Sequence, residues 1–133
     1  MASRSDDWRR QGRRDLEHAR RARADGDHEW ACFAAHQAAE KVLKAVFQAR
    51  GEDAWGHAVS GLLGALGVTQ GDPLMTRAKA LDKHYVLTRY PNGFASGAPV
   101  DYYTDDDAGR AIEDAEAISR YCDSLLAGPR PDP

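Results

Sequence analysis

An acid, a phenol and a guanidinium recur at helical spacing in this 133-residue chain. Asp82, Tyr85 and Arg89 are three and four residues apart, so a helix running through them presents all three side chains on one face. Tyr90 follows directly, and Pro91 ends the helix because the residue before a proline disfavours helical angles. These residues are candidates for ligand binding. The alternative is structural, with an Asp82–Arg89 bridge that pins the following loop and Tyr90 packed as a lid.

A second set of polar side chains follows the helix expected over about residues 27–50. On a helical wheel, its alanine, valine and leucine residues cover more than half of the circumference, so the helix must contact several partners. The polar remainder gathers on one arc, which also carries Phe33. The members of this arc are His36, Gln37, Glu40, Lys41, Lys44 and Gln48. The arc could line a groove for a nucleotide or form the solvated or dimer-facing side of the helix, and the aromatic favours an interface.

Other common chemistries lack their residues in this chain. There is no glycine-rich phosphate loop, no paired-histidine metal spacing and no carboxylate cluster suited to magnesium. Asp105 to Asp107 match the start of a last helix that Thr104 caps. Cys32 and Cys122 have no Cys-x-x-Cys spacing and lie among apolar neighbours, which predicts buried, reduced thiols. We therefore expect no metal and no cofactor.

The composition is typical of one folded domain. Charged residues make up 29% of the chain and hydrophobic residues 42%, and the net charge of −3 gives no overall attraction to nucleic acid. Eight arginines fall within the first 23 residues, where they form a basic patch or, as we favour, a solvated helix face. No apolar run reaches the about 18 residues of a membrane span, and the N-terminus lacks a hydrophobic signal core. These features predict a cytoplasmic protein.

Helical periodicity predicts a single all-α domain over residues 1–133, with its core at about 6–127 and a loose tail at 128–133. The fold expected is an up-and-down bundle of four long helices and one short helix. Pro73 suits the first position of the fourth helix. Glycines and a proline make residues 92–103 the longest loop. The helices are expected over about residues 6–24, 27–50, 57–66, 73–90 and 105–127.

Four sequence features occur in a characteristic order along the chain. They are Trp8 near the start of the first helix, the string Trp30 to Lys41 followed by Lys44, the pair Gly56-His57 before Leu62-Leu63, and Leu81 to Tyr85 leading into Thr88-Arg89-Tyr90-Pro91. In order and spacing, these features resemble the HEPN domain family of small prokaryotic proteins. The resemblance covers about residues 8–126, nearly the whole chain.

The resemblance implies a helical bundle, usually dimeric, in one of several roles. Some members resemble metal-independent ribonucleases that act as toxins, many are encoded beside a small nucleotidyltransferase that serves as antitoxin, and others are binding modules. We therefore expect a HEPN-type component of a toxin–antitoxin or nucleotidyltransferase-linked module that binds nucleotide or RNA. The alternative is a noncatalytic dimeric domain that docks a partner nucleotidyltransferase. The candidate nucleotide- or RNA-binding residues are Asp82, Tyr85, Arg89, Tyr90, Lys41 and Lys44.

The ribonuclease members use an Arg and a His on one helix. A neutral His can take the proton of a 2′-hydroxyl while an Arg holds the phosphate, and no metal is needed. Such pairs occur at four places in this chain, so position must decide. Arg77 and His84 lie on the predicted fourth helix two turns apart, and Tyr85 follows, so this pair is the catalytic candidate. The alternative is that Arg77 is a surface residue and His84 a partly exposed side chain, which leaves open whether the chain is an enzyme.

The apolar arc of the core helix, together with Trp30 and Phe33, predicts a symmetric homodimer. Five helices of one chain do not cover that much apolar surface. We expect the interface to use parts of the first two helices or the last helix. Light scattering at tens of micromolar should give twice the chain mass of 14.6 kDa, and the mass of a single chain would reject the prediction.

Overall fold

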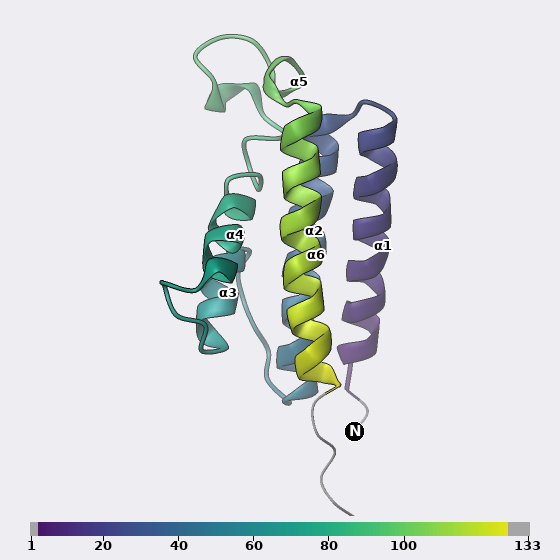
Figure 1. The fold of residues 1–133 in the computed structure, drawn as a ribbon, viewed down its shortest axis with the longest axis vertical. Coiled ribbons are helices and arrows are strands. Elements are labelled where there is room, and N and C mark those ends of the chain that lie inside the picture. The colour runs from purple at the N-terminus through teal and green to yellow at the C-terminus, as the bar shows by residue number, and fades with distance from the viewer. Residues whose placement is uncertain (1–2, 128–133) are drawn as a thin grey trace, which may run out of the picture.

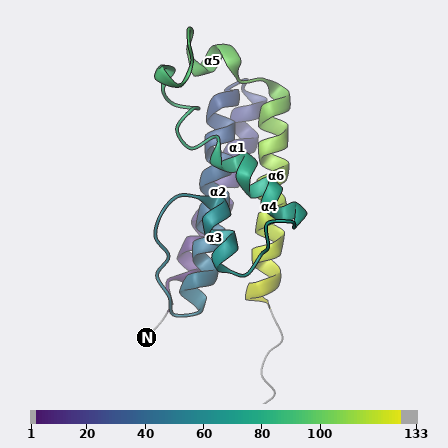
Figure 2. The ribbon, with the colours of Figure 1, turned by 90° about the vertical axis from the view of Figure 1, so that its left-hand side faces the viewer.

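The computed structural model describes residues 3–127, and every regular element within them is helical. The helices α1, α2 and α6 run side by side along the long axis, and α3 and α4 lie against α2 and α6 (Figures 1 and 2). The predicted all-α bundle is confirmed. The predicted tail, residues 128–133, lies outside the described residues. The elements are α1 (Ser5–Ala24), α2 (His28–Ala49), α3 (Val59–Ala65), α4 (Pro73–Asp82), the 3-10 turn η1 (Pro91–Gly93), α5 (Pro99–Tyr102) and α6 (Asp105–Leu126).

The helix α2 is the centre of the bundle, as its apolar arc predicted. It packs against α1, α3, α4 and α6, and its alanines from Ala31 to Ala45 are almost completely buried. The approach of α1 is closest at Gly12, where a Cβ atom would lie 2.8 Å from Cγ1 of Val42 and 3.2 Å from the carbonyl oxygen of Ala38. Small residues on both helices therefore set the distance between α1 and α2.

The arginine-rich face of α1 is paired with acids rather than forming a free basic patch. Four pairs join α1 to α6, with nitrogen–oxygen distances of 2.9 Å for Arg9–Asp123, 3.8 Å for Arg13–Asp123, 2.8 Å for Arg20–Glu116 and 2.9 Å for Arg23–Asp105. All eight arginines of the first 23 residues have a carboxylate within 4.0 Å: Arg4, Arg9, Arg10, Arg13, Arg14, Arg20, Arg21 and Arg23. The solvated face that we favoured is observed, and its pairing with acids is a feature that was not predicted from the sequence.

The fourth helix is shorter than predicted, because α4 ends at Asp82 and not before Pro91. The chain continues as turns in which side chains take over helical hydrogen bonds. The Thr88 hydroxyl donates to the carbonyl of His84 (2.8 Å), and the Arg89 guanidinium donates to the carbonyl of Tyr85 (3.0 and 2.5 Å). These two carbonyls would otherwise accept the amides of residues 88 and 89 in a helix. The predicted helical face through Asp82, Tyr85 and Arg89 therefore does not form.

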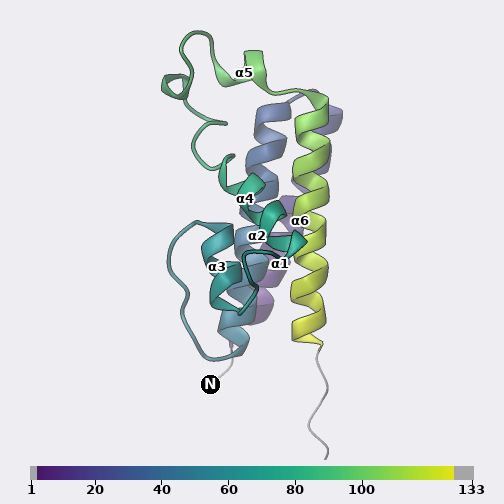
Figure 3. The same ribbon diagram turned by 60° about the vertical axis from the view of Figure 1, so that its left-hand side comes forward.

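The segment between α4 and α6 rises to the end of the bundle at which α2 begins (Figure 3). The long loop predicted at residues 92–103 contains α5, which has Pro99 at its first position. The predicted cap of α6 is confirmed, since Thr104 Oγ1 accepts from the Asp107 amide (3.2 Å) and Asp107 accepts from the Thr104 amide (2.9 Å). Within residues 3–127, no helix is long and apolar enough to cross a membrane.

The two cysteines are free and buried, as predicted. Burial raises the pKa of Cys32 to about 12 and that of Cys122 to about 12. Both thiols therefore stay protonated at neutral pH and pack as small apolar side chains.

Leu43 of α2 and Ile118 of α6 are completely buried, so truncation of either should cost much of the stability. We expect Leu43→Ala or Ile118→Ala to lower the free energy of unfolding by about 2–5 kcal/mol, measured by urea denaturation. Val100→Ala is a suitable control because Val100 is 66% exposed, and it should change stability by no more than about 0.5 kcal/mol. An unchanged midpoint for both core variants would show that these residues do not hold the bundle together.

Candidate functional site

The surroundings of Arg89 differ from those of the arginines in α1. Its Cζ atom lies 4.3 Å from the ring centroid of Phe33, 5.1 Å from that of Tyr85 and 5.3 Å from that of Tyr90. Among residues 3–127, no carboxylate forms an ion pair with it. A partly buried guanidinium over aromatic rings and without a carboxylate keeps its attraction for an anion such as phosphate.

Two half-exposed rings extend this group toward solvent. Trp30 meets Phe33 edge to face, with ring centroids 6.3 Å apart, and its side chain is 51% exposed. Tyr90, in the turns that follow α4, is 50% exposed. We call Trp30, Phe33, Tyr85, Arg89 and Tyr90 the Arg89 cluster. Helix α2 supplies the first two residues and the turns after α4 supply the other three, so the cluster depends on how these segments dock.

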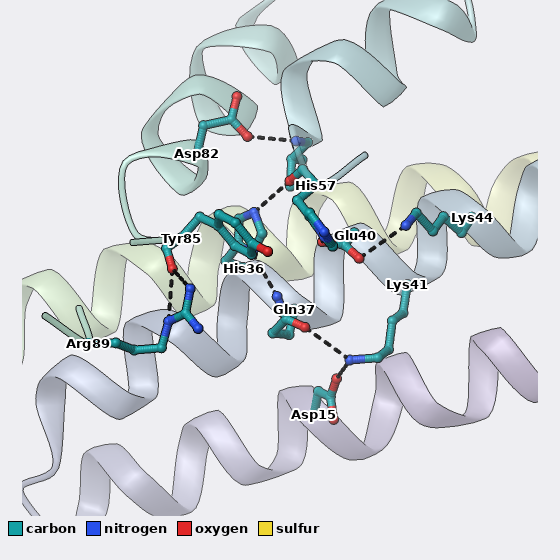
Figure 4. A network of polar contacts seen from close by, with 11 residues as sticks. Asp15, His36, Gln37, Glu40, Lys41, Lys44, His57, Asp82, Tyr85 and Arg89 are labelled. Carbon is teal, nitrogen blue, oxygen red and sulfur yellow. Dashed lines mark hydrogen bonds and ion pairs between the residues drawn. The ribbon is translucent and has the colours of Figure 1, made fainter. Parts of the chain in front are cut away.

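The buried imidazole of His36 holds the docked segments together. Its Nε2 lies 2.9 Å from the carbonyl oxygen of His57, and its Nδ1 lies 3.2 Å from Nε2 of Gln37 (Figure 4). Because the other amide atom of Gln37 accepts from Lys41 (3.4 Å), the Gln37 nitrogen faces His36 and donates to it. His36 therefore carries its proton on Nε2 and donates to the His57 carbonyl. Burial lowers the pKa of His36, which keeps this ring neutral.

The side chain of His57 forms a dyad with Glu40. Nδ1 of His57 lies 3.0 Å from Oε1 of Glu40, whose other oxygen accepts from Lys44 at 3.3 Å. The His57 ring also stacks on Tyr85, with centroids 4.7 Å apart and planes 16° apart. The Glu40 carboxylate is 6% exposed, whereas the His57 side chain is 55% exposed. A buried carboxylate on one nitrogen fixes the ring, and Nε2 has no partner among residues 3–127, so it is free to bind a ligand.

The structure brings together three of the predicted binding residues, Tyr85, Arg89 and Tyr90, and separates Asp82 from them. Asp82 accepts from the amides of Val59 (2.6 Å) and Ser60 (3.3 Å) and from the Ser60 hydroxyl, so it caps α3. The Asp82–Arg89 bridge considered as an alternative is not formed. The side chain that caps α3 is thus that of Asp82 and not that of the neighbouring His57.

The predicted binding residues Lys41 and Lys44 are already paired with acids. Lys41 Nζ lies 2.5 Å from Asp15, and Lys44 Nζ lies 3.3 Å from Glu40 and 5.6 Å from the ring centroid of Trp8. Both side chains are mostly covered. Their part in binding stays a prediction, and their charges are less available than that of Arg89.

The catalytic candidates Arg77 and His84 contact different parts of the bundle. Arg77 lies in α4 and donates to Asp114 of α6 (2.9 Å), while His84 follows the end of α4 and has Nδ1 3.4 Å from the Tyr103 hydroxyl. The expectation that both share one helical face is wrong, because α4 ends at Asp82. Burial lowers the pKa of His84 to about 4. The catalytic role of this pair stays a prediction.

Sequence reasoning missed the Glu40–His57 dyad and the place of Trp30. One signal in the sequence pointed to the place of Trp30, because the neighbouring Phe33 was an aromatic side chain on an otherwise polar arc of α2. No spacing rule connects Glu40 to His57, since a loop separates their elements. Residues 3–127 contain no group of three or more His, Cys, Asp or Glu side chains arranged to hold a metal ion.

The HEPN domain model of protein families matches residues 5–125. The chain belongs to the HEPN domain family. Its structure is similar to that of TT1696 from Thermus thermophilus, with a TM-score of 0.88 and 39% identity over 94% of this chain and 100% of the other. It is also similar to ST0689, an archaeal HEPN homologue, with a TM-score of 0.79 and 37% identity over 94% of this chain and 99% of the other.

A HEPN domain protein from Thermotoga maritima is a third similar structure. Its TM-score is 0.72, and it is 40% identical over 91% of this chain and 98% of the other. No curated protein sequence matches this HEPN chain. The relatives therefore establish the family and the fold, and the chemistry must be argued from this chain's own residues.

The partly buried His84 predicts that this HEPN domain is sensitive to acid. Its pKa is about 4 in the folded protein against an ordinary value of 6.5, so the unfolded chain binds the extra proton as pH falls from about 6.5 to about 4. Stability from this group is complete above that window and is lost within it. His84→Asn keeps an acceptor for the Tyr103 hydroxyl but does not titrate. Between about pH 7 and pH 4 the free energy of unfolding should fall in both proteins. The fall in His84→Asn should be smaller than the fall in wild type by about 2–3 kcal/mol.

The control for this experiment is His18→Asn, since His18 is exposed on α1. It should show the wild-type dependence of unfolding on pH. If His84→Asn lost stability on acidification as steeply as wild type and His18→Asn, burial of His84 would not be the cause of the acid sensitivity.

Proposed function

We propose that this HEPN chain binds nucleotide or RNA in the cytoplasm, as a component of a toxin–antitoxin or nucleotidyltransferase-linked module. The observation that carries the proposal is the Arg89 guanidinium, which lies over three aromatic rings and pairs with no carboxylate among residues 3–127. Binding of single-stranded nucleic acid combines a positive charge for the phosphate with aromatic faces for the bases. The Arg89 cluster offers both.

The charge distribution favours a short single strand or a nucleotide over a duplex. The net charge is −3, and the arginines of α1 are paired with acids, so no broad basic surface tracks a double helix. A single unpaired guanidinium suits one phosphate at a time. The half-exposed rings of Trp30 and Tyr90 can stack on bases on either side of it.

The test is the affinity for a fluorescently labelled single-stranded RNA, measured by anisotropy at fixed salt. Arg89→Gln removes the proposed phosphate ligand and should weaken binding about tenfold or more, the usual effect of losing a hydrogen bond to a charged group. Arg110→Gln is the matched control, because Arg110 is exposed on α6 and takes no part in the ring contacts of the cluster. It should bind RNA as wild type does, and circular dichroism should show both variants folded.

Equal weakening of RNA binding in Arg89→Gln and Arg110→Gln would show that the RNA is held by general charge attraction and not by the Arg89 cluster. Absence of binding by wild type to RNA and to nucleotides would reject the proposal. The noncatalytic alternative, a dimeric domain that docks a partner nucleotidyltransferase, would then lead. A specific observation favours that alternative, since large apolar side chains are exposed within residues 86–102. These are Val86, Leu87, Tyr90, Val100 and Tyr102.

A ribonuclease role for Arg77 and His84 is tested on the same RNA in excess EDTA, which silences metal-dependent nucleases. Loss of a general base typically costs about 10²–10⁴ in rate. Cleavage that disappears in His84→Ala and persists in His18→Ala would support catalysis by this pair. Intact RNA with every variant would leave binding as the function.

A further inference from the structure

A depression of about 450 Å³ opens beside His57, between the segment that follows α2 and the first turns of α3. Its lining is mostly apolar and includes Phe47, Trp55, His57, Gly61 and Leu62. Trp55 is 86% exposed, more than any other large apolar side chain among residues 3–127. An indole left in solvent at the rim of an apolar depression contributes little to the core and presents a flat face to a ligand.

We propose that this depression takes the base of a nucleotide whose phosphate lies on Arg89, and that His57 selects bases that carry an amino group. The inference rests on the proposed function. Tyr85 connects the two ends of the site, because its ring stacks on His57 at 4.7 Å and lies 5.1 Å from Cζ of Arg89 (Figure 4). The His57 ring and the Arg89 guanidinium therefore lie on either side of one phenol ring, a separation that a single nucleotide can bridge.

The tautomer of His57, which Glu40 sets, determines which bases it selects. Glu40 is buried and occupies Nδ1 of the ring, so Nδ1 carries a proton and donates it, and in the neutral form of the ring the lone pair is on Nε2. In that form Nε2 accepts a hydrogen bond and cannot donate one. Cytosine and adenine carry an exocyclic amine that donates, whereas uracil and hypoxanthine carry a carbonyl at the same position. The site should therefore prefer cytosine to uracil and adenine to hypoxanthine, within rings of equal size.

The experiment measures the affinity of the full chain for four labelled RNA homopolymers of one length, oligo(C), oligo(U), oligo(A) and oligo(I). Wild type should bind oligo(C) about three- to tenfold more tightly than oligo(U), the value of one hydrogen bond, with the same order for oligo(A) over oligo(I). Trp55→Ala should weaken all four by about fivefold or more through loss of stacking. His57→Phe keeps a ring against Tyr85 and should abolish both preferences, so that oligo(C) binds no more tightly than oligo(U) and oligo(A) no more tightly than oligo(I).

Two further variants separate this inference from the proposed function. Arg89→Gln should weaken all four RNAs by the same factor and keep the preferences, because it acts on the phosphate. Arg110→Gln, on exposed α6, should leave affinities and preferences at their wild-type values. Binding that depends on Arg89 but is unchanged in Trp55→Ala and His57→Phe would overturn the base site and leave the proposed function standing. Binding of no RNA by wild type would overturn both.

Discussion

The carboxylate of Asp82 binds the first free amides of α3, and the arrangement of the site follows from those bonds. With this cap in place, the start of α3 lies at the end of α4. His57, two residues before Val59, then directs its carbonyl to the buried His36 ring. The next turn of the chain brings Tyr85 onto the His57 ring. Arg89 then folds back over Tyr85 and reaches Phe33 of α2. One acid at a helix end thus connects three segments that are distant in sequence.

Helix α2 serves both as the core of the bundle and as the floor of the site. Its apolar side contacts the other helices, and its polar side carries groups that burial would penalise if they lacked partners. Two of them have such partners beneath the site: His36 has a carbonyl and an amide, and Glu40 has Lys44 and His57. At the first turn of α2, by contrast, Nδ1 of His28 is buried without a hydrogen-bond partner among residues 3–127. Around His36 and Glu40 the polar side of α2 is therefore held by bonds within the fold, and the atoms left for a ligand lie at its edge, on His57 and Arg89.

The fold could be predicted from the sequence because its signals are local and repeated. Apolar residues at helical spacing, Pro73 at a helix start and Thr104 at a cap each agreed with the structure. The end of α4 was missed, since nothing in the order of residues shows that the Thr88 and Arg89 side chains replace two helical hydrogen bonds.

The site was predictable only in part, because most of its contacts join different elements. Tyr85, Arg89 and Tyr90 were found as neighbours in sequence, and they are neighbours in space. The Glu40–His57 dyad spans a loop, and no pattern of spacing indicates it. The Arg–His pairs could not be ranked by spacing for the opposite reason. An arginine-rich chain contains several pairs at the required spacing, so the spacing does not identify one of them.

The ion pairs between α1 and α6 have a consequence for how the bundle is aligned. The pairs at Arg9, Arg20 and Arg23 meet acids that descend in number along α6, as expected of two antiparallel helices. A slide of one turn, about 5.4 Å, would part all three of these pairs together. Gly12 opposes the same slide of α1, because its place against Val42 has no room for a Cβ atom. The charges add little to stability on a surface, yet they favour the alignment that the packing at Gly12 also requires.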